Sequence, residues 1–184
     1  MPEFVWILVG VAVLVLTWVV ATLNRIVALR NHIAESWSGI DVALKRRYDL
    51  IPNLVETVKG YATHEQEVID RIVKAREHAI GTLGAADVQA LSQNELVSAL
   101  NHFFVRVEAY PQLKASEHFM ELQRELANTE DRIAAARRFY NANVRAYNTM
   151  VESFPASMVA GSNVRAPYFE VESLQVRETP AVSV

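Results

Sequence analysis

The sequence contains no cysteine and is poor in glycine and proline, with six of each among its 184 residues. Without cysteine the chain can form neither a disulfide-stapled fold nor a cysteine-ligated zinc or iron–sulfur site. So little glycine and proline excludes a collagen-like or low-complexity chain. The 18 basic and 21 acidic residues leave a net charge of −3, whereas nucleic-acid binding needs a positive face. We therefore expect no nucleic-acid partner.

Catalytic and cofactor-binding motifs are also missing. The sequence has no Walker loop, no G-x-G-x-x-G and no G-x-S-x-G motif. None of the five histidines follows a glutamate by three residues, which excludes the usual Glu-x-x-His pairs of di-iron helical bundles. His64 and Glu65 begin like a zinc-binding H-E-x-x-H motif, but Val68 stands where the second histidine belongs. We predict a protein that is not an enzyme and has no catalytic residue, cofactor or metal.

Charge is absent from the 20 residues 4–23, and 17 of them are apolar. A helix of that length measures about 30 Å, which is the thickness of the hydrocarbon layer of a bilayer. A cleaved signal peptide is the alternative, but it would have a basic start and a shorter apolar run. Residues 1–3 contain no base. We therefore predict a retained transmembrane anchor over residues 4–23 that contacts the lipid bilayer.

The charges beside this apolar run predict its orientation. No lysine or arginine precedes it, whereas Arg25 and Arg30 follow it closely and residues 45–47 are Lys-Arg-Arg. Because positive flanks stay on the cytoplasmic side, the N-terminus is expected outside and everything after Leu23 in the cytoplasm.

Apolar residues recur at spacings of three and four through the rest of the chain, as in amphipathic helices. We expect the first helix to run on to Arg47 and a new start at Asp49 and Pro52. The second helix should continue, straight or kinked, to Ala79. Ser92-Gln93-Asn94-Glu95 reads as a capping box that opens a third helix, which ends before Pro111 and has a seam of Leu96, Leu100, Phe103 and Val107. This helix is short beside the others, so either its start lies before Ser92 or the second and fourth helices project beyond it. The fourth should span 116–153, with a coiled-coil seam of Leu122, Leu126, Thr129, Ile133, Ala136, Tyr140, Asn143, Tyr147, Met150 and Phe154.

These segments predict an all-α protein. Its N-terminal transmembrane helix (1–24) runs into an antiparallel up-down four-helix bundle (25–155). A short extended C-terminal tail (156–184) follows, because Pro167 and Pro180 bracket a stretch with no helical pattern.

Several polar residues interrupt the apolar seams or cluster at their ends. The run 45–47 is interpreted as a solvated helix end, with lipid contact as the alternative. Glu65 and Asn143 lie on seams, and a buried carboxylate needs a partner. We expect an internal polar network that includes Arg47 or Arg137; a ligand pocket and a partner-docking notch are the alternatives.

His64 fits a surface histidine or, alternatively, a pH sensor. Tyr168 and Phe169 could pack against helix ends or anchor a subunit contact.

Residues 44–65 form a distinctive block, from Leu44-Lys45-Arg46-Arg47-Tyr48-Asp49-Leu50-Ile51-Pro52-Asn53 to His64-Glu65. This block closely resembles the LemA family of bacterial membrane proteins, and the resemblance extends from about Ala28 to Pro180. The later motifs are Ala136-Arg137-Arg138-Phe139-Tyr140-Asn141, Tyr147-Asn148, Phe154-Pro155 and Tyr168-Phe169-Glu170. The family implies a membrane anchor and a four-helix bundle in the bacterial inner membrane, without an established reaction or cofactor. A magnetosome-associated branch suggests work on membrane shape or organisation.

The candidate interaction or polar-network residues come from these motifs and seams. They are Arg46, Arg47, Asp49, Asn53, Tyr61, His64, Glu65, Tyr140, Asn141, Asn143, Tyr147, Asn148, Tyr168 and Phe169. Our leading hypothesis is a membrane-anchored scaffold that forms a homo-oligomer and organises the membrane or its proteins. The alternative is a cytoplasm-facing adaptor that docks a membrane protease or signalling partner through residues 45–54. An unrecognised enzyme is a third reading, which the missing constellations disfavour.

Overall fold

The computed structural model describes residues 2–61, 65–172 and 174, and all regular structure in those residues is helical. The prediction of an all-helical chain with a long apolar N-terminal helix is therefore confirmed. The elements in chain order are α1 (Pro2–Lys59), α2 (Gln66–Gly81), α3 (Ala86–Val107), α4 (Pro111–Lys114), α5 (Glu117–Glu152) and the 3-10 turn η1 (Ala156–Met158).

The helix α1 is 58 residues long and does not restart at Asp49, so that prediction is wrong. Proline inside a helix removes one N–H and leaves the carbonyl four residues earlier without its partner. Here that carbonyl belongs to Tyr48, and it accepts a hydrogen bond of 2.8 Å from Nε of Arg76 on α2. Because α2 supplies the missing donor, α1 passes through Pro52 intact.

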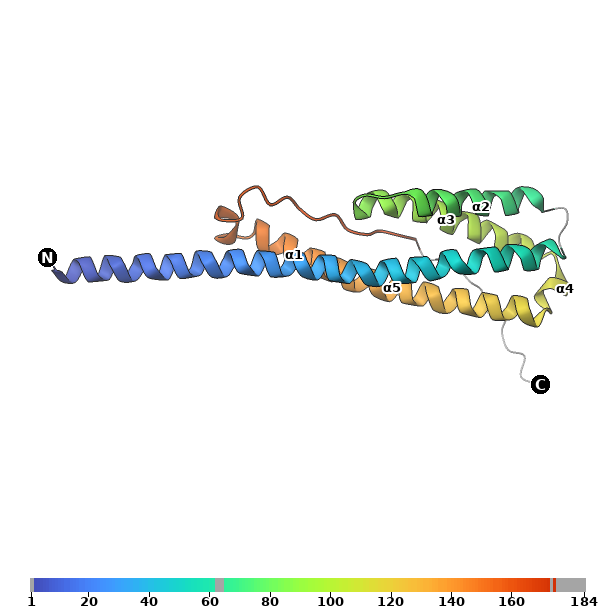
Figure 1. Cartoon of the computed structure of the whole chain (residues 1–184), viewed down its shortest axis with the longest axis horizontal. Coiled ribbons are helices and arrows are strands. Elements are labelled where there is room, and N and C mark those ends of the chain that lie inside the picture. The colour runs from blue at the N-terminus through green and yellow to red at the C-terminus, as the bar shows by residue number, and fades with distance from the viewer. Residues whose placement is uncertain (1, 62–64, 173, 175–184) are drawn as a thin grey trace.

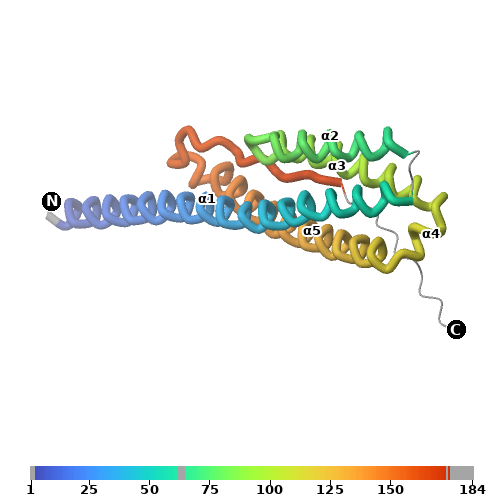
Figure 2. The backbone as a smooth tube through the Cα atoms, turned by 45° about the vertical axis from the view of Figure 1, so that its right-hand side comes forward, coloured from blue at the N-terminus to red at the C-terminus, as the bar shows by residue number. Residues whose placement is uncertain are grey.

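The helices lie as two antiparallel pairs (Figure 1). Helix α5 packs along α1, and α3 packs along α2. The α2–α3 pair covers only the part of α1 and α5 that is remote from the N-terminus (Figures 1 and 2). Nearer the N-terminus, the chain after η1 runs along α5 instead. Beyond that, α1 extends alone as a rod.

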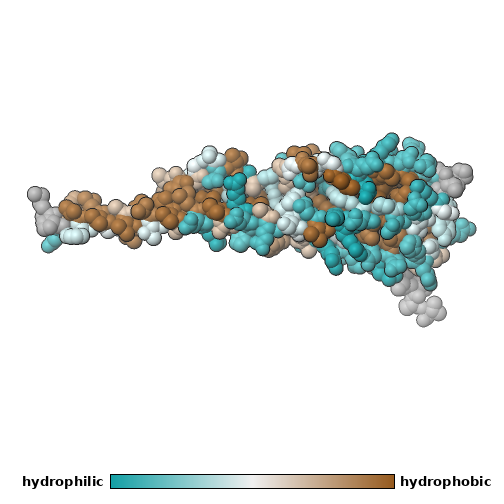
Figure 3. Space-filling view, in the orientation of Figure 1, coloured by the Kyte–Doolittle hydropathy of each residue, from teal (hydrophilic) through white to brown (hydrophobic). Residues whose placement is uncertain are grey.

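The rod is the apolar run identified from the sequence. Among the described residues, α1 alone is long and apolar enough to cross a membrane, and none of its most apolar 18-residue stretch is buried. Figure 3 shows the apolar surface of this rod beside a helical body that is largely polar. Within the run, the hydroxyl of Thr17 donates to the carbonyl of Val13 at 2.8 Å, so this polar group is satisfied inside the helix.

The boundaries of α2 and α3 differ from the prediction. The favoured continuous helix to Ala79 is wrong, because α1 ends at Lys59 and α2 begins at Gln66. The capping box at Ser92 is also wrong, since α3 already begins at Ala86 and the Ser92 hydroxyl donates back to the carbonyl of Gln89. The loop between α2 and α3 is therefore only residues 82–85, and the alternative in which the third helix starts before Ser92 is confirmed.

Helix α5 begins and ends almost where its pattern predicted, and the Ser116 hydroxyl accepts the N–H of Phe119 as an N-cap. The predicted seam holds as far as Tyr140 but then drifts by one residue. Val144 and Val151 are buried rather than Asn143 and Met150. A helix turns every 3.6 residues, so its buried face rotates away from a strict seven-residue repeat.

One large apolar core unites the far parts of the helices. It contains buried residues of α1, α2, α3, α4 and α5, and also Phe169, Val171 and Leu174 from the segment that follows η1. A second, smaller cluster lies nearer the N-terminus and contains Ile26, Leu29, Tyr147, Val151 and Ala160.

Candidate interaction site

A buried polar cluster centres on Arg47, in the C-terminal third of α1. The guanidinium is fully buried. Its Nη1 lies 3.1 Å from Oε1 of Glu130 on α5, and its Nη2 donates to Oε1 of Gln93 on α3. The Nε2 of Gln93 in turn donates to the hydroxyl of Tyr48 at 2.6 Å. The cluster therefore joins three helices through one charge and its partners.

The solvated helix end expected for residues 45–47 is thus wrong for Arg47, which is neither exposed nor at a helix end. The spacing of the sequence contains the signal, because Arg47 continues the seam of Ile40, Leu44, Ile51 and Leu54 at intervals of three and four. Its neighbour Arg46 is exposed and pairs with Glu125 of α5. Residues 45–54 are therefore the side of a packed helix and not the tip that the adaptor hypothesis required.

Burial also affects the acidity of Tyr48. Desolvation raises the pKa of its hydroxyl above the ordinary value, whereas the hydrogen bond from Gln93 and the nearby Arg47 lower it. The hydroxyl therefore stays neutral near pH 7 and accepts from Gln93. The Nε of Arg47 has no hydrogen-bond partner within the described part of the chain, so Glu130 and Gln93 are the contacts that compensate its burial.

A second polar arrangement holds the segment 164–172, which we call the strap. The strap has no helical or strand hydrogen bonds of its own, yet buried or half-buried backbone groups need partners. Asn148 of α5 exchanges two bonds with the backbone of Ala166, at 2.8 and 3.0 Å. Asn141 does the same with Phe169, at 2.9 and 3.0 Å. Each amide side chain thus pairs with the strap as a neighbouring strand would.

Two tyrosines, each directly before one of these asparagines in the sequence, also donate to the backbone of the strap. The hydroxyl of Tyr147 donates to the carbonyl of Val164 at 3.3 Å, and that of Tyr140 donates to the carbonyl of Pro167 at 3.1 Å. The Tyr-Asn pairs are seven residues apart on α5, about 10.5 Å along a helix. Their strap partners are three residues apart, about 10 Å in an extended chain. The two spacings match, so this repeat on α5 fixes the position of the strap.

The strap is also anchored by an aromatic cluster. Phe169 is fully buried, and its ring lies edge-on to Trp37 of α1 with centroids 5.3 Å apart. Trp37 makes a second edge contact with Tyr140, at 5.2 Å. Asn94 of α3 then continues the polar pairing by accepting from the N–H of Glu172 at 2.8 Å. Phe169 therefore packs against the middle of helices and not against helix ends.

The remaining candidate residues do not join these clusters. Asp49 and Asn53 are exposed on α1, and Tyr61 is exposed just after it. Glu65 accepts a bond of 3.0 Å from the hydroxyl of Tyr110, and this bond is the largest cause of the raised pKa of Tyr110.

The other expected partners are also placed differently. Asn143 donates to the carbonyl of His32 at 3.4 Å, so neither it nor Glu65 is hydrogen-bonded to Arg47. Tyr168 is half-buried against the core. His64 lies outside the described residues. The sequence interpretation did not single out Gln93, Asn94, Trp37 or Glu130.

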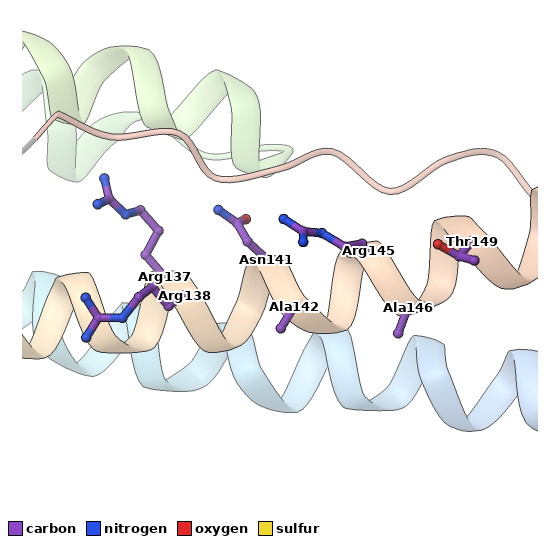
Figure 4. Close-up of a pocket in the computed structure, with 7 residues that line it drawn as sticks. All are labelled: Arg137, Arg138, Asn141, Ala142, Arg145, Ala146 and Thr149. Carbon is purple, nitrogen blue, oxygen red and sulfur yellow. The ribbon is translucent and has the colours of Figure 1, made fainter.

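An arginine-lined hollow of about 650 Å³ follows the outer side of α5 (Figure 4). The side chains of Arg137, Asn141 and Arg145 point from α5 toward the strap, and Ala142 and Ala146 point the other way (Figure 4). Arg137, Arg138 and Arg145 have no ion pair with any described residue. The hollow is therefore a positively charged surface.

A long apolar helix that continues into a helical body defines a membrane-associated, all-helical protein. The sequence profile of the LemA family matches residues 36–184, and the chain belongs to that family. The resemblance seen in the motifs is confirmed.

Individual relatives agree with this assignment. The chain is 30% identical to Protein LemA of Metamycoplasma hominis over 168 residues, which cover 88% of this chain and 72% of the relative. It is 24% identical to Magnetosome protein MamQ of Magnetospirillum gryphiswaldense, over 90% of this chain and 72% of the relative. It is 25% identical to Magnetosome protein MamQ 2 of Paramagnetospirillum magneticum, over 89% and 71%.

Proposed function

We propose that this chain is a non-enzymatic, membrane-anchored four-helix-bundle protein that self-associates as a scaffold organising the membrane or its proteins. Residues 4–23 cross the bacterial inner membrane, with the N-terminus outside and the bundle in the cytoplasm. Arg25 and Arg30, which follow the apolar run directly, support that orientation through the positive-inside rule.

The observation that carries the proposal is the continuity of α1. One helix contains both the apolar run and the core residues Ile40, Leu44, Ile51 and Leu54. No loop separates the anchor from the body, so the body is held at a fixed height above the bilayer. Copies in one membrane therefore present the same surfaces at the same height, which is the geometry that lateral contacts between copies require.

The surface we assign to these contacts is the apolar tip of the α2–α3 pair. Leu83 and Leu91 are 85% and 72% exposed, and Ile80 and Val88 are also exposed. Four large apolar side chains around one short loop are unusual on a surface that faces only water. A second copy anchored beside the first would bring its own tip to this level, and the contact would remove both tips from water.

The decisive measurement is the assembly mass of the full-length protein in nanodiscs large enough for several copies. We expect a uniform oligomer that Leu83→Lys combined with Leu91→Lys reduces to the monomer. Val105→Lys is the matched control, because Val105 is 65% exposed on α3 but away from the tip. A protein that stays monomeric at micromolar concentration would reject the scaffold. Co-purification of another membrane protein, lost in the tip variant, would then favour the adaptor.

A further inference from the structure

The loop that joins α5 to the strap has an unusual composition. We call residues 153–163 the end loop; all eleven are uncharged. The nearest charges on either side, Glu152 and Arg165, pair with each other at 2.8 Å between Oε1 and Nε. The ion pair closes the base of the loop and leaves its whole length without charge.

The side chains of the end loop are arranged with the small residues inside and the large apolar residues outside. Ala156 and Ala160 are buried, at 7% and 5% exposure. Phe154 and Met158 are 81% and 75% exposed. A loop that faced only water would be expected to turn its largest apolar side chains inward. This loop does the reverse, which indicates an apolar environment outside it.

The end loop lies beside the part of α1 that directly follows the apolar run, where a membrane would provide such an environment. Ala160 and Val151 pack with Ile26 and Leu29 of α1, in the smaller core cluster. Those two residues follow the end of the apolar run by three and six positions, or about 4.5 and 9 Å along the helix. The headgroup layer on each side of a bilayer is about 5–7 Å thick. With residues 4–23 in the membrane, Ile26 lies within the headgroup layer and Leu29 just outside it, so the end loop that packs on them faces the headgroups.

Three further observations agree with this position of the loop. Thr22, within the last turn of the apolar run, is only 5% exposed, whereas the next residue, Leu23, is 41% exposed. Apart from α1 itself, the end loop is the part of the chain nearest the N-terminus in both views (Figures 1 and 2). In space-filling view the apolar surface of the rod continues onto the region where the loop lies (Figure 3).

We infer that the end loop is a second membrane contact, in which Phe154 and Met158 enter the interface of the same bilayer that α1 spans. The inference rests on the proposed anchoring through residues 4–23 but not on self-association. The apolar run of α1 and the end loop would together fix the rotation and tilt of the helical body relative to the membrane. A single transmembrane helix cannot do so, because it is free to rotate about its own axis. The occupant of this apolar surface is thus lipid.

The absence of cysteine allows a direct test with the full-length protein. Phe154→Cys and Met158→Cys each provide one site for a nitroxide label. The labelled protein is reconstituted into vesicles of zwitterionic and anionic phospholipid. Two reference positions are Leu14→Cys, in the middle of the apolar run, and Val105→Cys, on α3 away from the α2–α3 tip; both side chains are exposed, at 71% and 65%. Collisions with oxygen report lipid, and collisions with a water-soluble nickel chelate report water.

We expect the oxygen-to-nickel accessibility ratio at positions 154 and 158 to be several-fold higher than at 105 and to approach that at 14. Values equal to those at 105, with position 14 still in lipid, would overturn the inference and leave the anchor intact. A water-like signal at 14 as well would overturn both. Low access to both reagents with spin–spin broadening would assign the loop to a second copy and would likewise overturn the lipid contact. Circular dichroism of each variant verifies that the labelled chain is folded.

Discussion

The two halves of the α1–α5 pair are covered in different ways. In the half remote from the N-terminus, α2 and α3 complete a core of apolar side chains around one buried charge, Arg47. In the half nearer the N-terminus, α2 and α3 are absent and the strap lies along α5 (Figure 1). The first half is built from helix against helix, and the second from an extended chain against two helices.

The difference explains where the polar residues of α5 lie. A helix satisfies its own backbone, so the contact between two helices can be apolar throughout. An extended segment without a neighbouring strand must find donors and acceptors elsewhere. Helix α5 supplies them through Tyr140, Asn141, Tyr147 and Asn148. These tyrosines and asparagines in its second half therefore hold the strap.

The largest effect is expected in the far half, from Glu130→Ala. Removing this carboxylate leaves the fully buried Arg47 without its charge partner, and breaking such a pair costs about 3–5 kcal/mol of unfolding free energy. Denaturant unfolding of the detergent-solubilised protein, followed by circular dichroism, measures the loss. The matched control is Glu125→Ala, which breaks the exposed pair with Arg46 and should cost less than about 1 kcal/mol. Equal losses in both variants would show that burial of Arg47 carries no special penalty.

The strap should respond next, through Phe169→Ala at its end that enters the large core. Removal of a buried phenylalanine ring costs about 3–5 kcal/mol in a closed core. We expect the low end of that range, since the strap can detach while the helices stay packed. Hydrogen exchange should then accelerate in residues 164–172 before it does in α3 or α5. A single cooperative loss of protection in all three segments would mean that the two halves unfold together.

A smaller effect is expected from Asn148→Leu, which keeps the volume but removes both bonds to Ala166. Unpaired buried backbone groups cost about 1–3 kcal/mol. The comparison variant is Asn143→Leu, which removes one bond of 3.4 Å and should cost less than about 1 kcal/mol. Limited proteolysis within the strap is the sensitive measurement, and faster cleavage is expected only for the first variant. Equal cleavage rates would show that the Tyr-Asn repeat does not hold the strap.

The comparison of the halves also shows what the sequence could predict. The apolar run, the seam of α3 and the ends of α5 follow from local periodicity and capping, and all three are found in the structure. The passage of α1 through Pro52 depends on Arg76, which is 24 positions away and has no local signature.

The contacts of the strap could not be predicted from helical periodicity, for a related reason. Asn141 and Asn148 lie beside the predicted seam, and only their partners in the strap explain them. Arg47 was expected in an internal polar network, but the sequence alone does not locate its buried partners Gln93 and Glu130. In each case the missing information is a contact between segments that are remote in the chain.

The smallest effect is expected where the two halves meet, at Gly39. A Cβ added there would lie 3.9 Å from Cβ of Ala136, an ordinary contact distance, and no other atom is closer. Alanine restricts the unfolded chain and favours the helix by about 0.5–1 kcal/mol relative to glycine. Gly39→Ala should therefore stabilise the protein by about that amount, measured as a shift of the denaturation midpoint at constant slope. A loss of stability would mean that α1 and α5 approach more closely here than this spacing allows. The packing of α1 against α5 at this junction would then require a residue without a side chain. Gly39 would be needed for close packing, and would not be a position where the helix is simply less stable.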